Sequence, residues 1–254
     1  MLLPRIIPLL LLSGKGLVKG IQFKDHKYVG DPINAVQIFN TKQVDELIFL
    51  DITATKENRI PPIDLIQKIA DQCLMPFGVG GGIKSLEDAR LILNSGAEKV
   101  VLNTYALKNP ELINNISNTF GNQSVVVSLD IKKNIFGKYI TTTNCGTKSF
   151  NLNISEALTL IESAGAGEVL INNIDRDGTC QGYDCEILKE VSESISIPVI
   201  ASGGAWDLKH LQDGLIKGKA SAVAAGSMFV LHGKRKAVLI SYPDKDELVQ
   251  IRGR

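Results

Sequence analysis

Two carboxylates each end a short apolar stretch of this 254-residue chain. The stretch 124–132, Ser-Val-Val-Val-Ser-Leu-Asp-Ile-Lys, carries Asp130 near its end, and Asp51 ends the stretch 47–51 in the same way. A carboxylate at the C-terminal end of a buried parallel strand lies where α/β barrels and doubly wound sheets bind their ligands. Either side chain could therefore act as a general acid or base.

Paired glycines follow two other apolar stretches, at Gly81-Gly82 and at Gly203-Gly204. Glycine lets the backbone approach a ligand closely and present N–H groups to an anion. Small or polar residues stand nearby in each half of the chain: Asn103 and Thr104, Asp177 and Gly178, and Gly226 and Ser227. We predict two phosphate sites on opposite sides of one ligand-binding mouth, although glycines here could also serve only as tight turns.

Four charged residues fall at the first positions of expected strands: Arg5, Glu46, Lys99 and Glu168. Strand starts lie at the opposite end of a barrel from strand ends, so these residues would meet on the barrel floor. Two cations and two anions there can neutralise one another in a ring. A purely structural ion cluster explains the same pattern, because buried charges must be paired wherever they occur.

Composition excludes several classes of function. The 28 Lys and Arg residues against 27 Asp and Glu leave a net charge of +1, which predicts neither nucleic-acid nor membrane binding and favours a small-molecule ligand. The four cysteines and three histidines are dispersed, so we expect no metal, no disulfide and a reducing, cytoplasmic setting. The apolar run 6–12 is too short for a membrane span and lacks a signal-peptide cleavage site, which favours an interior strand.

Short apolar runs alternate with amphipathic stretches from end to end, which predicts one continuous domain over residues 1–254. Eight strands are expected, at 6–11, 47–51, 77–79, 100–103, 124–130, 169–172, 199–201 and 222–225. Capping residues stand before several expected helices, at Asp31-Pro32, Ser85 and Asn109-Pro110. The fold class is therefore a (β/α)8 barrel.

The sequence also repeats itself at a spacing of 122 residues. The segment 45–51 corresponds to 167–173, and the glycine-containing segment 76–82 corresponds to 198–204. A period of about half the chain, with four strand–helix units in each period, predicts a barrel built from two half-barrels. In the first half, the position that corresponds to Asp130 is Leu11. The polar segment 131–153 breaks the alternation and is expected to form a hairpin inserted over the strand ends.

These residues resemble the cyclase subunit family of imidazole glycerol phosphate synthase, HisF, over essentially the whole chain to about Phe229. The matching motifs occur in order at 5–7, 18–20, 30–32, 45–47, 49–52, 79–83, 103–104, 130, 174–179 and 201–204. The resemblance implies that a glutaminase, HisH, binds the barrel floor in a heterodimer and releases ammonia. The ammonia then crosses the barrel to PRFAR, a ligand with two phosphates, which is cyclised and cleaved to imidazole glycerol phosphate and AICAR in histidine biosynthesis.

The resemblance also assigns roles to individual residues, and it implies no cofactor. Arg5, Glu46, Lys99 and Glu168 match the ammonia gate, and Gln123 matches a position near the glutaminase. The phosphate contacts match Gly82, Asn103 and Thr104 in one half and Asp177, Gly178, Gly203, Gly204, Gly226 and Ser227 in the other. Asp130 matches one of two catalytic aspartates, whereas the other falls on Leu11, so Asp51 is the remaining candidate for an auxiliary role.

Leucine cannot exchange a proton, so the resemblance leaves cyclase chemistry without one carboxylate. Val101 and Asn172 also differ from the residues usual in the family. The ending 229–243 looks like HisF-like paralogues of bacterial surface-sugar pathways. This likeness implies a HisH-like and HisF-like pair that supplies ammonia to a separate ATP-dependent amidotransferase, which amidates a lipopolysaccharide O-antigen sugar. A third hypothesis is an isomerase like the related HisA barrels. It is weaker, because such an isomerase would have no use for an ammonia gate.

Overall fold

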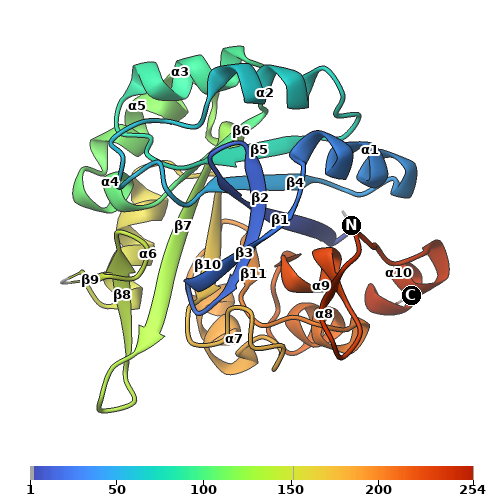
Figure 1. Ribbon diagram of the computed structural model, residues 1–254. Coiled ribbons are helices and arrows are strands. Elements are labelled where there is room, and N and C mark those ends of the chain that lie inside the picture. Colours follow the sequence, from blue (N-terminus) through green and yellow to red (C-terminus); the bar gives the residue numbers. More distant parts are fainter. Residues whose placement is uncertain (1–2, 151, 254) are drawn as a thin grey trace.

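Eight parallel strands close into a barrel in the computed structural model, which describes residues 3–150 and 152–253 (Figure 1). Neighbours around the barrel follow the order β1-β4-β5-β6-β7-β10-β11-β12 and return to β1. The strands span β1 (Arg5–Ser13), β4 (Leu47–Asp51), β5 (Phe77–Gly80), β6 (Lys99–Leu102), β7 (Val125–Lys133), β10 (Glu168–Asn173), β11 (Val199–Ser202) and β12 (Ala222–Ala225). The predicted (β/α)8 barrel is confirmed.

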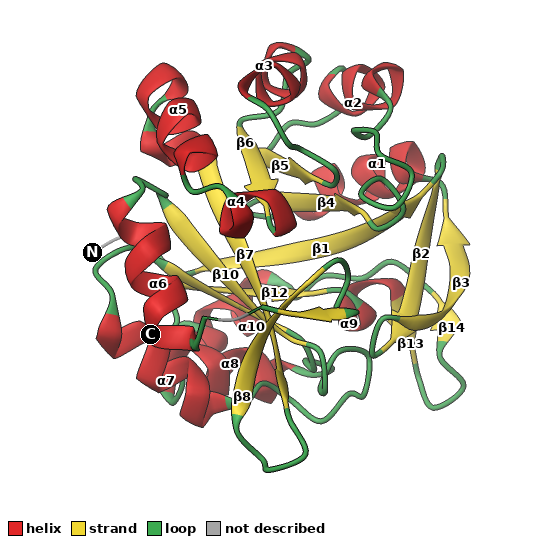
Figure 2. Cartoon of the chain, turned by 90° about the vertical axis from the view of Figure 1, so that its left-hand side faces the viewer, coloured by secondary structure: helices red, strands yellow, loops and turns green. Residues whose placement is uncertain are grey.

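Helices surround the strands on the outside, as the red ribbons of Figure 2 show. They are α1 (Pro32–Lys42), α2 (Ile63–Ala70), α3 (Leu86–Asn94), α5 (Glu111–Phe120), α6 (Ile154–Ser163), α7 (Cys185–Ser194), α8 (Leu208–Ile216) and α10 (Lys245–Ile251). Shorter turns are α4 (Thr104–Lys108), α9 (Ser227–Val230) and the 3-10 turn η1 (Asn122–Ser124). None of the helices in the described ranges is long and apolar enough to cross a membrane.

Helix starts follow the capping residues in the sequence. The Asp31 carboxylate accepts hydrogen bonds from the N–H groups of Ile33 and Asn34, and Ser85 forms a reciprocal capping box with Asp88. These contacts satisfy backbone donors that the first helical turn leaves free. The expectation at Asn109-Pro110 is wrong in detail, because Pro110 itself precedes α5 and no side chain caps that helix.

Side chains along each barrel strand point alternately outward and inward, so the hydrophobic core has one part outside the strands and one part inside the barrel. On β1, Ile6, Leu10 and Leu12 pack outward against the helices, whereas Ile7, Leu9 and Leu11 face the barrel interior. This is the period of two expected for a strand that is buried on both faces. The interior cluster is closed by apolar side chains of the other strands: Ile48, Val101, Val126, Leu170, Ile200, Ala222 and Ala224.

Three hairpins extend beyond the barrel. The predicted insertion over 131–153 is present, since β7 continues to Lys133 and pairs with β8 (Tyr139–Thr143), which pairs with β9 (Lys148–Ser149). The hairpin of β2 (Gly16–Ile21) and β3 (Lys24–Gly30) was not among the expected strands. The hairpin of β13 (Leu231–His232) and β14 (Ala237–Val238) was not predicted.

Candidate functional site at the barrel mouth

A pocket of about 590 Å³ opens at the C-terminal ends of the barrel strands. It is lined by every residue that the sequence assigned to catalysis or phosphate binding: Asp51, Gly81, Gly82, Asn103, Thr104, Asp130, Asp177, Gly178, Gly203, Gly204, Gly226 and Ser227. Residues from both halves of the chain therefore meet in one cavity. Its volume suits a ligand of ordinary metabolite size.

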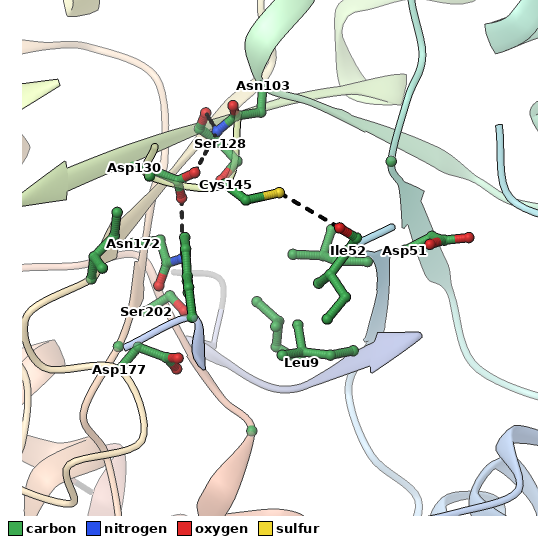
Figure 3. Close-up of a pocket in the computed structure, with 18 of the residues that line it drawn as sticks. Leu9, Asp51, Ile52, Asn103, Ser128, Asp130, Cys145, Asn172, Asp177 and Ser202 are labelled. Atoms are coloured by element: carbon green, nitrogen blue, oxygen red, sulfur yellow. Dashed lines mark hydrogen bonds between the residues drawn. The ribbon is translucent and has the colours of Figure 1, made fainter. Parts of the chain in front are cut away.

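Asp130 is buried at the end of the regular barrel pairing of β7, and two amides hold its carboxylate (Figure 3). Asn172 Nδ2 donates to Asp130 Oδ1 at 3.1 Å, and Asn103 Nδ2 donates to Asp130 Oδ2 at 3.0 Å. Burial raises the pKa of Asp130 to about 7, while the two amide donors act in the opposite direction. A carboxyl group that titrates near neutral pH can give or take a proton at the mouth.

Asp51 lies in the same pocket but is engaged differently. Its carboxylate accepts hydrogen bonds from the N–H groups of Thr53 and Ala54, and Arg59 Nη1 lies 2.5 Å from Oδ2. Figure 3 shows this carboxylate directed away from Asp130. The Asp51 side chain therefore holds the segment after β4 in place. This structural role occupies the carboxylate, so it competes with an auxiliary catalytic role.

An apolar surface faces the pocket from β1. Leu9 and Leu11 both line the pocket and are 8% exposed, and Leu50 on the adjacent strand β4 and Val101 on β6 line it as well. Leu11 pairs with Leu50 on β4 and with Val18 on β2. All three residues are apolar, so these paired positions provide no carboxylate. At the mouth, the Asp130 carboxyl group, which has no cation partner among the described residues, thus shares the pocket with an apolar wall, whereas Asp51 and Asp177 are paired with Arg59 and Lys19.

The paired glycines are explained in part by close backbone packing. A Cβ atom on Gly82 would lie 1.8 Å from the Arg59 carbonyl oxygen, and one on Gly203 would lie 2.5 Å from the Asn173 carbonyl oxygen. Tight packing of these loops is therefore sufficient reason for glycine at both positions. In the two halves, α4 begins at Thr104 and α9 begins at Ser227, so the predicted phosphate contacts stand at equivalent places of the half-barrels.

Lys19 is a mouth residue for which the sequence predicted no role. Its ammonium group lies 2.7 Å from Asp177 Oδ1, and the side chain is 6% exposed. Gln22 adds two hydrogen bonds, from its N–H to the Asp177 carbonyl and from Nε2 to the Asp175 carbonyl. These contacts hold the β2–β3 hairpin against the loop that carries Gly178. The signal in the sequence was weak, because one lysine between Val18 and Gly20 has no distinctive spacing.

At the opposite end of the strands, the four predicted gate residues form a closed ring of ion pairs. Arg5 contacts Glu46 at 2.5 Å and Glu168 at 3.0 Å, and Lys99 contacts Glu46 at 2.9 Å and Glu168 at 3.1 Å. Burial lowers the pKa of Arg5, but Glu168 and Glu46 together raise it above its usual value. Among the described residues, Glu168 Oε2 is buried without a hydrogen-bond partner.

Comparison with known proteins agrees with this geometry. A family profile described as "Histidine biosynthesis protein" matches residues 5–235. The chain belongs to the HisF family. The provisionally named imidazole glycerol phosphate synthase subunit hisF2 of Pseudomonas aeruginosa is 48% identical over 244 residues, which cover 96% of this chain and 97% of that protein.

Two further relatives place the chain within the same family. A provisionally named HisF subunit of this synthase from Leptospira borgpetersenii is 45% identical over 98% of this chain and 99% of that protein. The imidazole glycerol phosphate synthase subunit HisF of Alkaliphilus metalliredigens is 41% identical over 90% of this chain and 91% of that protein. The family resemblance stated from the motifs is confirmed.

Proposed function

We propose that this HisF-family chain takes ammonia from a HisH-type glutaminase at the ring of ion pairs and carries it to a bis-phosphate ligand at the mouth. The observation that carries the proposal is the division of the barrel into a charged floor, an apolar interior and a polar mouth. Neutral ammonia can cross an apolar interior, whereas an ammonium ion would lose its hydration there without a counter-charge. Ion pairs at the floor can open and close that path.

The delivered ammonia has two candidate uses. One is the reaction of the HisF family, and the other is suggested by the residues that line the mouth. In the family reaction, PRFAR and ammonia give imidazole glycerol phosphate and AICAR, with proton transfers that Asp130 alone would have to serve. Leu11 favours a second use, in which the chain delivers ammonia without cyclising a ligand. The acceptor would then belong to an ATP-dependent amidotransferase that amidates a surface sugar. The four cysteines are free thiols, which supports a reducing, cytoplasmic setting as part of the proposal.

Binding to a purified HisH-type glutaminase tests the proposal. Size-exclusion chromatography should show a stable one-to-one complex, and Glu46→Lys should weaken it or block ammonia passage by breaking the ring. Lys68→Met, on the exposed side of α2, is the matched control and should change neither property. Failure of the wild-type chain to bind any HisH-type glutaminase would contradict the proposal.

Passage of ammonia is tested with glutamine labelled at the amide nitrogen. In the complex, Lys99→Met should reduce transfer of the label from glutamine to any product formed at the mouth, while use of added ammonium salts persists. Equal losses with both nitrogen sources would place the defect at the mouth instead of the ring. An unchanged label transfer in Lys99→Met would show that the ring does not control the path.

A further inference from the structure

A second cavity, of about 440 Å³, lies beside the barrel mouth, and its lining residues belong neither to the mouth nor to the ring of ion pairs. The two cavities adjoin at two places, the loop between β11 and α8 and the first turn of α9. Ala205 and Ser227 line the mouth, whereas the next residues along the chain, Trp206 and Met228, line the second cavity. We call this second space the outer cavity. It lies where α8, α9 and α10 gather on one side of the barrel in Figure 1.

The outer cavity is apolar and aromatic, with a polar edge. Phe229 and Tyr242 form part of its lining and pack on each other with ring centroids 5.4 Å apart. Trp206 supplies a third aromatic side chain, and it is the single tryptophan of the sequence. At the edge stands Glu247, one of whose carboxylate oxygens accepts the Asp244 N–H at 2.8 Å.

The β13–β14 hairpin lines the outer cavity with His232 and Gly233, and cations follow these residues in the chain. Its turn carries Lys234, Arg235 and Lys236 in succession, all exposed. Within the described part of the chain, no carboxylate lies within 4 Å of the charged nitrogens of these three residues. Three adjacent cations without counter-ions repel one another, so an anion bound between them lowers the electrostatic energy.

Lys236 connects the hairpin to both cavities. Its ammonium group lies 3.4 Å from the Gly178 carbonyl oxygen, on the predicted phosphate loop, and 5.9 Å from the centre of the Trp206 ring. A lysine held over an indole ring is positioned by a cation–π contact instead of moving freely in water. The cation and the aromatic surface are therefore adjacent and can contact one ligand together.

We propose that the outer cavity binds a nucleoside phosphate, with its base against Trp206 and its phosphate between Lys236 and Arg235. A flat ring matches the aromatic lining, and the phosphate matches the unpaired cations of the turn. The Glu247 carboxylate can accept a hydrogen bond from a ribose hydroxyl, as acidic side chains do in other nucleotide sites. The inference concerns a space outside the mouth, so it is independent of the proposed ammonia delivery.

Titration of the full chain with ADP tests the proposal, because fluorescence reports on Trp206 alone. ADP should quench this fluorescence saturably. Adenosine and inorganic pyrophosphate should each bind about tenfold more weakly, because each lacks half of the contacts. Lys236→Ala should weaken ADP binding about tenfold and leave adenosine binding unchanged. Lys189→Ala, on the exposed side of α7, is the matched control and should have no effect.

Calorimetry with two further variants shows which cavity is used. Met228→Trp should fill the outer cavity and abolish ADP binding, whereas Asn103→Leu at the mouth should leave it intact. The reverse pattern would overturn the proposal, as would the absence of saturable ADP binding at millimolar concentration. Pyrophosphate binding as tightly as ADP would also overturn it. Tighter binding of a glutamate-rich peptide containing phenylalanine would instead assign the cavity to a protein segment and overturn it as well.

Discussion

Asn172 on β10 stands in register with Asp130 on β7 and donates a hydrogen bond from Nδ2 to Asp130 Oδ1 at 3.1 Å. Asn103 donates to the other oxygen, so both oxygens of the buried carboxylate have an amide donor. These donors favour the ionised form of Asp130, while burial favours the protonated form. The balance between the two effects determines the charge at the mouth near neutral pH.

Asn172→Leu should raise the pKa of Asp130 above about 7, because it removes one donor to the carboxylate and leaves the burial unchanged. Carbon-13 NMR of the aspartate carboxyl groups measures this value directly. Asn118→Leu, on the exposed face of α5, is the control and should leave it unchanged. A fall in the pKa of Asp130 in Asn172→Leu would show that the amide does not stabilise the carboxylate.

Asp130→Asn should change how stability depends on pH. The native carboxyl group keeps its proton until about pH 7, whereas the unfolded one loses it near the ordinary value of 3.8. The native state therefore binds more protons between these values, and the wild-type free energy of unfolding falls as pH rises through them. Relative to wild type, Asp130→Asn should gain stability over this interval, by at most about 4 kcal/mol.

Urea unfolding at pH 4 and pH 7 measures that difference. Asp64→Asn provides the control, because Asp64 is exposed at the start of α2 and pairs with an exposed lysine, Lys15. A stability difference between Asp130→Asn and wild type that is the same at both pH values would refute the prediction.

Arg59→Met should destabilise the fold by about 3 kcal/mol, because it leaves the buried Asp51 carboxylate without its cation. Glu57→Gln is a matched control, since it removes the exposed partner of the same guanidinium group and should cost less than about 1 kcal/mol. Thermal and urea unfolding provide the measurement. Equal losses in the two variants would mean that the Asp51 contact has no special weight.

Lys19→Met should loosen the β2–β3 hairpin, because it removes the cation that pairs with Asp177. Hydrogen exchange should become faster in residues 16–30, with a loss of about 1–3 kcal/mol in overall stability. Lys15→Met removes an exposed pair with Asp64 in the neighbouring segment and should leave exchange in the hairpin unchanged. Unaltered exchange in Lys19→Met would show that the Gln22 hydrogen bonds hold the hairpin alone.

The barrel strands were predictable from the sequence because they are buried on both faces. The expected strand 47–51 agrees with β4, and 222–225 agrees with β12. The expected strand 100–103 differs by one residue at each end, since Asn103 instead precedes α4 and donates to Asp130. The 122-residue repeat predicted which strand ends meet, because half-barrel symmetry fixes that arrangement, and the residues at those ends line one pocket.

The hairpins were harder to predict, because tertiary contacts stabilise them more than their own patterns do. In β3, only Val29 is buried, so the strand lacks the alternation that marks a half-buried sheet. Its partner β2 is held by Lys19 and by the close approach of Gly178 to the Gly20 carbonyl oxygen. Neither contact can be derived from sequence spacing, since the partners are 158 residues apart in the chain.

The mouth can be tested most directly by measuring PRFAR turnover with ammonium salts in the wild type and in Leu11→Asp. The account predicts no turnover above background in the wild type. It predicts a gain of about 10²-fold or more in Leu11→Asp, because the second carboxylate restores a proton-transfer group opposite Asp130. Efficient turnover by the wild type, with no gain in Leu11→Asp, would contradict the claim that Leu11 separates this chain from a working cyclase.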